Sequence, residues 1–140
     1  MRINQRLVDA AIDLMNQRFS QEEWAGAAAM YTREGALLTS LYMDRGYGGA
    51  GLCYETGAIC EAHKLGHTVT ASVCVARAPH SDRIVILTPC GICQERLFYW
   101  GADVEVAVPD PADPTIWQAK TLREVQPHFW AKVYDDKLGF

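Results

Sequence analysis

The first apolar residues of the chain recur every three or four positions, which is the spacing of one helix face. They are Ile3, Leu7, Ala10, Ala11, Leu14 and Met15. This pattern predicts a helix over residues 3–19. Two apolar stretches follow, at residues 24–31 and 36–43, and a short segment that contains a glycine separates them. Two such stretches around a short turn predict a β-hairpin.

The remainder of the chain alternates between helical and strand-like patterns. Residues 45–51 contain four glycines and predict a loop, after which a helix is expected to begin at Cys53 and to end at Gly66. Runs rich in β-branched residues predict strands over residues 70–77, 84–87 and 103–108. Further helical segments are expected over residues 90–100 and 121–125. Strands that alternate with helices of this length predict a layered α/β fold whose later strands can be parallel.

Length and composition narrow the class of protein. A chain of 140 residues with 49% hydrophobic content can bury one core, so we expect a single domain over residues 1–140. The net charge is −4, and no run of Lys or Arg could neutralise a phosphate backbone, so a nucleic-acid polymer is not an expected partner. No apolar run reaches the ~20 residues of a membrane span, and the first residues lack the apolar core of a signal peptide. We therefore expect a cytoplasmic protein without a membrane partner.

Five cysteines in a reducing compartment indicate metal binding or catalysis before disulfides. Cys90 and Cys93 have the C-x-x-C spacing that lets one loop bind one zinc ion. Two alternatives exist for the remaining ligands. Cys60 with His63 would complete a closed structural site, whereas Cys53 alone would leave one position open for water. They exclude each other, because a helix places residue 60 about 10 Å from residue 53.

Glu55 favours the open site. A carboxylate two residues after Cys53 can transfer the proton of a water molecule at the open zinc position, and a structural site has no need of it. Cys53 also follows the glycine-rich segment, where the start of a helix can stabilise its thiolate. Cys60 and Cys74 are expected to be core thiols. The sequence thus predicts Zn²⁺ on Cys53, Cys90 and Cys93, with Glu55 as the catalytic residue.

The pair of motifs Cys53-Tyr54-Glu55 and Pro89-Cys90-Gly91-Ile92-Cys93 resembles the signature of the zinc-dependent cytidine deaminase superfamily. Over residues 24–127 the chain is similar to the small nucleoside branch, which includes cytidine deaminases and blasticidin-S deaminases. The resemblance implies a three-layer αβα fold around a central five-stranded mixed sheet. It also implies a homotetramer whose subunits complete one another's active sites. The aromatic residues of the tail, Phe129, Trp130, Tyr134 and Phe140, are expected to lie against a neighbouring subunit.

The activity that the resemblance implies is hydrolytic deamination of a cytidine-like amino-substituted heterocycle, with release of ammonia. Among substrate contacts, Trp24 matches the aromatic residue that lines the base pocket, and the backbone N–H of Tyr54 could hold the ring. Tyr42 and Asp44 fall at the family's Asn-x-Glu, which binds the sugar hydroxyls. A phenol does not reproduce the paired donor and acceptor of an amide, so ribose recognition is in question.

Two other functions therefore stay open. One is deamination of a substrate that is not a ribonucleoside, such as a free base, a modified nucleoside or a cytosine-bearing antibiotic. The other is a non-catalytic, zinc-stabilised binding module that uses Cys60, His63, Cys90 and Cys93. In the deaminase, three thiolates on a dication leave about one net negative charge. The two helix ends, or Arg96 if it folds back, are expected to offset this charge.

Overall fold

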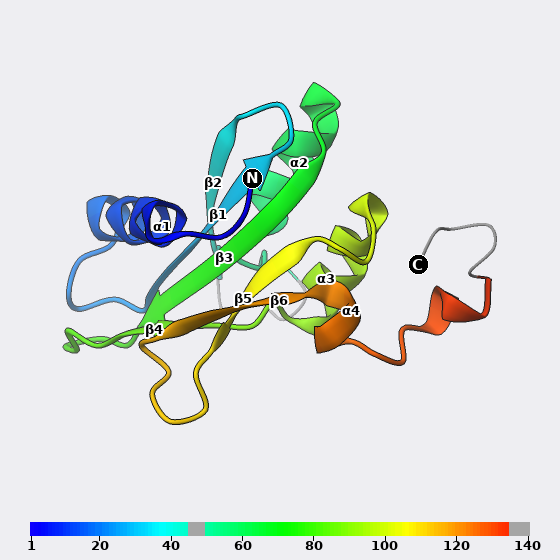
Figure 1. Cartoon of the computed structure of the whole chain (residues 1–140). Coiled ribbons are helices and arrows are strands. Elements are labelled where there is room, and N and C mark those ends of the chain that lie inside the picture. The colour runs from blue at the N-terminus through cyan, green and yellow to red at the C-terminus, as the bar shows by residue number, and fades with distance from the viewer. Residues whose placement is uncertain (45–49, 135–140) are drawn as a thin grey trace.

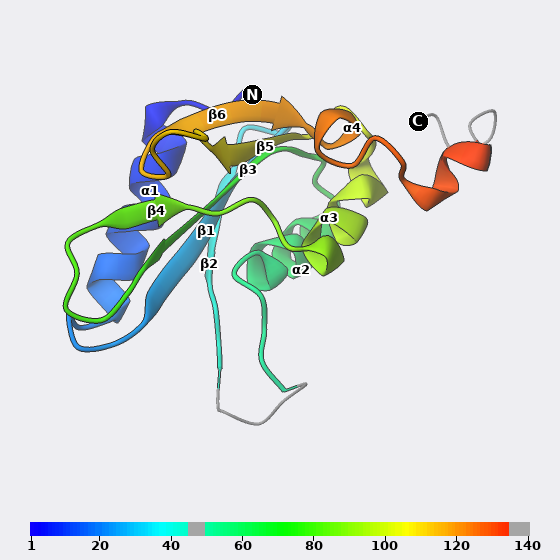
Figure 2. The same cartoon turned by 90° about the horizontal axis from the view of Figure 1, so that it is seen from below.

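The fold is a mixed β-sheet with helices on both faces. The computed structural model describes residues 1–44 and 50–134. Helix α1 covers one face of the sheet, and α2 and α3 cover the other (Figure 1, Figure 2). This arrangement confirms the predicted three-layer αβα fold. The predicted number of five strands is wrong, because the described residues form a sheet of six strands, in the order β2-β1-β3-β5-β6 with β4 paired to β3.

The N-terminal half follows the predicted pattern closely. Helix α1 (Gln5–Arg18) begins after Asn4, whose side chain accepts a hydrogen bond from the backbone N–H of Leu7, a capping arrangement that satisfies a free donor. Strands β1 (Ala25–Thr32) and β2 (Leu37–Leu41) form the predicted antiparallel hairpin. The sequence placed both ends of all three elements within two residues, and β2 ends at residue 41 where 43 was predicted.

Strand β3 (Val69–Arg77) is the centre of the sheet. It runs antiparallel to β1 on one side. On the other side its first half pairs in parallel with β5 (Glu105–Pro109), and its second half pairs antiparallel with β4 (Ile84–Ile86). The expectation of a parallel pair among the later strands is therefore confirmed.

Two helices cover the second face, and both start later than predicted. Helix α2 (Thr56–Leu65) does not begin at Cys53, because Cys53 lies in a turn that is closed by a hydrogen bond of 3.1 Å from the N–H of Thr56 to its carbonyl. Helix α3 (Gly91–Leu97) starts directly after Cys90 and continues as the 3₁₀-helix η1 (Phe98–Trp100). Both cysteines thus precede a helix.

Strand β6 (Trp117–Thr121) was not predicted. It pairs antiparallel with β5 at the edge of the sheet. Its three central residues are exposed and its two end residues are half-buried, so it lacks the alternation that marks a strand in a sequence. The edge of β5 offers backbone N–H and C=O groups as hydrogen-bond partners. Tertiary pairing, and not the local sequence pattern, therefore creates strand β6.

Two separate cores hold the layers together. The first lies between α1 and the sheet and contains Leu7, Ala11 and Met15. The second lies on the opposite face and includes the C-terminal segment, α4 (Leu122–Val125) and η2 (Trp130–Tyr134). In this segment Phe129 is buried and stacks on Phe98, with ring centroids 3.7 Å apart.

Only part of the aromatic tail is therefore available to a neighbouring subunit. Trp130 and Tyr134 are exposed, as the prediction of contact with another subunit requires. Phe129 is already buried within the chain. Phe140 and most of the predicted glycine-rich loop lie outside the described residues.

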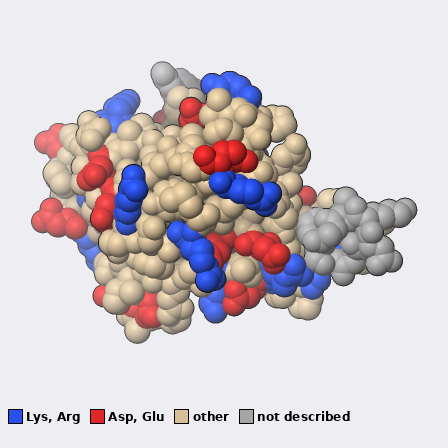
Figure 3. Space-filling model, turned by 45° about the horizontal axis from the view of Figure 1, so that its top comes forward, with Lys and Arg blue, Asp and Glu red and all other residues tan. Residues whose placement is uncertain are grey.

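Charged residues of both signs are mixed on the surface. On the face shown in Figure 3, Lys and Arg are interspersed with Asp and Glu, and they do not gather into a basic patch. Within the described part of the chain, no helix has both the length and the apolar character that crossing a membrane would need.

The start of α4 gives a pH-dependent prediction. Thr121 and Glu124 form a capping box, and the N–H and hydroxyl of Thr121 hold the pKa of Glu124 below its ordinary value. A lowered pKa stabilises the fold above the ordinary pKa of about 4.3, and this stabilisation disappears as the pH falls through the lower folded-state value. Glu124→Gln should lower the free energy of unfolding at neutral pH, and the gap to the wild type should narrow towards about pH 3. Urea denaturation at both pH values measures it. A gap between Glu124→Gln and the wild type that does not change with pH would contradict this assignment.

Candidate active site

Three thiols converge at the ends of two helices. The Sγ atoms of Cys53, Cys90 and Cys93 all lie within 4.8 Å of one another, and those of Cys53 and Cys90 are 3.3 Å apart. Zinc–sulfur bonds of about 2.3 Å at tetrahedral angles would place two sulfurs about 3.8 Å apart. The donor set therefore fits a zinc ion in both chemistry and spacing, and the three thiols could hold one.

Glu55 is buried beside these thiols. Its side chain is 1% exposed, and its Oε1 atom has no hydrogen-bond partner among the described residues. A buried and unpaired carboxylate oxygen is costly unless a partner arrives. The Cys93 thiol is a hydrogen-bonding neighbour of the same carboxylate. The carboxylate is thus in place to receive a proton from a molecule bound at the thiols.

Close packing against the sheet fixes the segment that carries Cys53 and Glu55. The hydroxyl of Ser40 on β2 donates a hydrogen bond of 2.6 Å to the carbonyl of Tyr54. The Tyr54 ring lies so close to β1 that a Cβ atom on Gly26 would stand 1.8 Å from its Cε1 atom. Likewise, a Cβ atom on Gly57 would stand 2.8 Å from the Cβ atom of Ser40. Two glycines therefore let the start of α2 approach both strands of the hairpin.

Burial dominates the electrostatics of the site. It raises the pKa of the Glu55 carboxyl, and burial followed by the charge of Glu55 raises the pKa of the Cys93 thiol. Burial and the neighbouring Cys90 thiol raise the pKa of Cys53. Burial also opposes ionisation of Cys90, but hydrogen bonds from the N–H of Cys93 and from the Cys53 thiol outweigh it and lower the pKa. Each of these acidic groups disfavours the ionisation of the others. A bound cation would stabilise their ionised forms.

The closed alternative is not formed. Among residues 1–44 and 50–134, the group of three or more metal-binding side chains that come together is Cys53, Cys90 and Cys93, without Cys60 or His63. Cys60 is exposed on α2, so the prediction that it lies in the core is wrong. Cys74 is buried, as predicted. His63 packs edge-on against Tyr99 instead of turning to the thiols.

A solved structure has both this fold and a related sequence. The crystal structure of the cytidine deaminase from Bacillus anthracis is 41% identical, with a TM-score of 0.87, and the match covers 96% of this chain and 94% of that chain. The chain belongs to the cytidine deaminase superfamily. Within it, the chain falls in the small nucleoside branch.

Two more distant similarities agree with this placement. A blasticidin-S deaminase from Bacillus cereus is 24% identical over 106 residues, which are 73% of this chain and 76% of that protein. The crystal structure of cytidine deaminase from Mycobacterium leprae is 21% identical with a TM-score of 0.69, covers 90% of this chain and 99% of that chain, and supports the fold. No protein-family model matches the sequence.

The residues predicted to contact substrate of this deaminase superfamily lie near one another. Tyr42 packs between Phe19 and Tyr54, with ring centroids 5.4 and 5.2 Å away. Its hydroxyl donates a hydrogen bond of 2.8 Å to the carbonyl of Trp24, whose side chain is 61% exposed. Burial raises the pKa of Tyr54 to about 12, so its phenol stays neutral. Asp44 is exposed at the end of the segment that follows β2.

Three residues that contribute to the candidate site were not given a role in the sequence analysis. Phe19 extends the aromatic row, Ser40 anchors the carbonyl of Tyr54, and Thr56 accepts a hydrogen bond of 2.9 Å from Nη1 of Arg96. A serine that alternates with Leu38 on the buried face of β2 is a signal that could have indicated Ser40. The expectation that Arg96 folds back agrees with its contact to Thr56, the residue next to Glu55.

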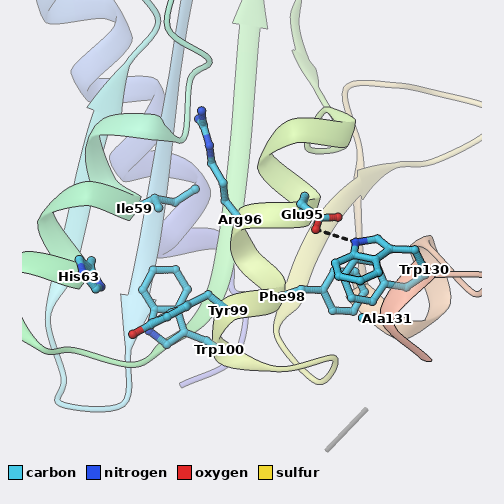
Figure 4. Close-up of a pocket in the computed structure, with 10 residues that line it drawn as sticks. Ile59, His63, Glu95, Arg96, Phe98, Tyr99, Trp100, Trp130 and Ala131 are labelled. Atoms are coloured by element: carbon cyan, nitrogen blue, oxygen red, sulfur yellow. Dashed lines mark hydrogen bonds between the residues drawn. The ribbon is translucent and has the colours of Figure 1, made fainter. Parts of the chain in front are cut away.

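A pocket of about 570 Å³ lies elsewhere, between α2, η1 and η2 (Figure 4). Aromatic side chains form much of its lining, and Trp130 donates a hydrogen bond of 2.7 Å to Glu95 at one side. None of the three clustered thiols and not Glu55 contributes to its lining. Chemistry therefore identifies the thiol cluster, and not this pocket, as the candidate active site.

The contact between Tyr54 and β1 gives a testable prediction. Gly26→Ala should force the Tyr54 ring away from the strand and lower the free energy of unfolding by about 1–3 kcal/mol, the usual range for overpacking. Denaturant titration measures the loss. Gly91→Ala is the matched control, because a Cβ atom there meets no heavy atom within 4 Å, and it should cost far less. Equal losses in the two variants would show that the Tyr54 packing is not as tight as the structure has it.

Proposed function

We propose that this chain is a zinc-dependent hydrolase that deaminates a cytidine-like amino-substituted heterocycle and releases ammonia. The observation that carries the proposal is the buried carboxylate of Glu55, whose Oε1 atom has no hydrogen-bond partner among the described residues, beside three thiols whose sulfurs lie within 4.8 Å of one another. Membership of the cytidine deaminase superfamily and the blasticidin-S deaminase among the similar proteins support the same reaction class.

Each proposed residue has a defined role. Cys53, Cys90 and Cys93 would hold the zinc ion. When bound, zinc lowers the pKa of a water molecule to near ~7, so that a nucleophile is available at neutral pH. Glu55 is the general base and acid, because it is the buried carboxylate next to the position that the three thiols leave open.

The proton transfers balance over the reaction. Glu55 takes a proton from the attacking water and gives it to the ring nitrogen of the substrate, as the water oxygen adds to the carbon that bears the amine. Glu55 then passes the second proton of that oxygen to the amine. The carbon–nitrogen bond breaks, ammonia leaves and a carbonyl remains. The raised pKa that burial gives the Glu55 carboxyl suits a group that must both accept and donate protons near neutral pH.

The sugar side of the site favours a second candidate substrate class. Tyr42 takes the place of the amide in the family's sugar-binding pair, and its hydroxyl is already bonded to the carbonyl of Trp24. A phenol held in that way contributes packing and not a pair of sugar hydrogen bonds. We therefore propose, as the alternative, a substrate that carries the cytosine ring without a standard ribose, such as a free base, a modified nucleoside or a cytosine-bearing antibiotic.

We further propose a cytoplasmic protein that works as one domain and assembles with copies of itself, as a tetramer by resemblance. The exposed aromatic residues around the pocket of Figure 4 support assembly, because Tyr99 and Trp130 are more than half exposed and lie side by side with other aromatic rings. A small amino-heterocycle is the proposed partner at the thiol site. A solution mass of four times 15.6 kDa would support the tetramer, and a mass of 15.6 kDa would contradict assembly.

Glu55→Gln tests the proposed chemistry. The amide keeps the shape of the carboxylate but cannot accept the proton, so turnover should fall by about 10²–10⁴-fold while zinc stays bound. Ammonia release and zinc content of the purified variant measure the two effects.

Cysteine variants serve as controls for this experiment. Cys53→Ala should lose zinc, whereas Cys60→Ala should keep it, because Cys60 lies exposed on α2 and outside the cluster. Zinc loss in Cys60→Ala, or unchanged turnover in Glu55→Gln, would reject the proposed ligand set or the role of Glu55.

A panel of substrates separates the two substrate classes. The panel contains cytidine, 2′-deoxycytidine, cytosine and blasticidin S, with Glu55→Gln as the blank. If Tyr42 makes no sugar hydrogen bond, loss of ribose hydroxyls should lower kcat/KM by less than about ten-fold, which is the value of about one hydrogen bond. A preference for cytidine of about 10³-fold or more would favour the ribonucleoside and reject the alternative. No ammonia from any compound would reject the proposed substrate class.

A further inference from the structure

The Arg96 side chain links the two segments that carry the thiols. Arg96 lies on α3 three residues after Cys93, so both side chains share one helix face. Its Nη1 atom donates a hydrogen bond of 2.9 Å to the hydroxyl of Thr56, the first residue of α2. In Figure 4 the guanidinium points away from Tyr99 and Trp130 of the aromatic pocket. Arg96 thus contributes to the lining of the pocket, while its guanidinium is directed towards the start of the helix that follows Cys53 and Glu55.

The position of Arg96 matters because the site holds excess negative charge. Three thiolates exceed the charge of a divalent ion by about one unit, and the buried Glu55 carboxylate adds to it. A hydrogen bond from Arg96 to Thr56 holds the positive charge of the guanidinium at the residue that follows Glu55, although the arginine itself is exposed to solvent.

We propose that Arg96 is a positioning residue for the thiol site, which holds the two ligand segments together through Thr56 and offsets their excess negative charge. This inference rests on the proposed function, since it concerns the same zinc site. It adds a residue from outside both cysteine motifs, and it makes Thr56 the partner through which that residue acts. Arg96 touches neither substrate nor the three sulfurs in this account, so its effect is on zinc affinity before turnover.

The test compares zinc dissociation constants by competition with a chromogenic chelator. Arg96→Gln should bind zinc about ten-fold more weakly or worse, as is usual when a residue that supports metal ligands is removed. Arg83→Gln is the matched control, because it removes the same charge from an exposed arginine that pairs with Asp113 instead. It should leave the constant within about two-fold of the wild type.

Two further measurements test whether Arg96 acts through its position beside Thr56 or only through the stability of the fold. Thr56→Val should weaken zinc binding, and adding Arg96→Gln to it should weaken binding no further than Arg96→Gln alone, because the two residues act through one contact. The difference between Arg96→Gln and Arg83→Gln should shrink as salt rises from about 0.05 M to about 1 M, since salt screens the charge of an exposed group.

The outcomes distinguish this inference from the proposed function. If wild-type protein binds no zinc, or binds it without Cys53, the proposed function fails and Arg96 has no site to support. If wild-type protein binds zinc through the cysteines but Arg96→Gln matches Arg83→Gln, only the inference on Arg96 is overturned. Independent, additive losses in Thr56→Val and Arg96→Gln would overturn it as well.

Discussion

The close approach of the segment Cys53-Tyr54-Glu55 to the β1–β2 hairpin is the constraint on which the rest of the site depends. Gly26 leaves room for the Tyr54 ring, and Ser40 holds the carbonyl of the same residue at 2.6 Å. These contacts fix a turn and not a helix around Cys53, which lets its sulfur reach the C-x-x-C at the start of α3. A larger residue on β1 would push the whole segment away from its partners.

The same packing creates the electrostatic problem that gives the site its chemistry. Burial places Glu55 out of water beside thiols that also resist ionisation. Such a set is unfavourable by itself, and it becomes favourable when a cation shares the space. The burial that the proposed function needs therefore lowers the stability of this part of the fold. The two hydrophobic cores, one on each face of the sheet, compensate for this loss.

The side of the site that we propose for the substrate contains a row of aromatic rings. The ring of Tyr42 lies between those of Phe19 and Tyr54. The Tyr42 hydroxyl donates a hydrogen bond to the carbonyl of Trp24. These contacts join the end of α1, the start of β1 and the turn at Cys53. Tyr42, which differs from the amide of the family's sugar-binding pair, thus has a structural use, and this is the basis for the proposed substrate without a standard ribose.

The sequence by itself determined the types of residue in the site and most of the elements, because helix and strand periodicity and the spacing within C-x-x-C are local properties. Residues 3–19 and 24–31 needed no tertiary information to be recognised as helix and strand. The tertiary structure decided which of Cys53 and Cys60 joins Cys90 and Cys93, where Arg96 points, and that β6 forms at all. Each of these depends on a contact between residues far apart in the chain, and only the packing of α2, α3 and the sheet against one another sets such distances.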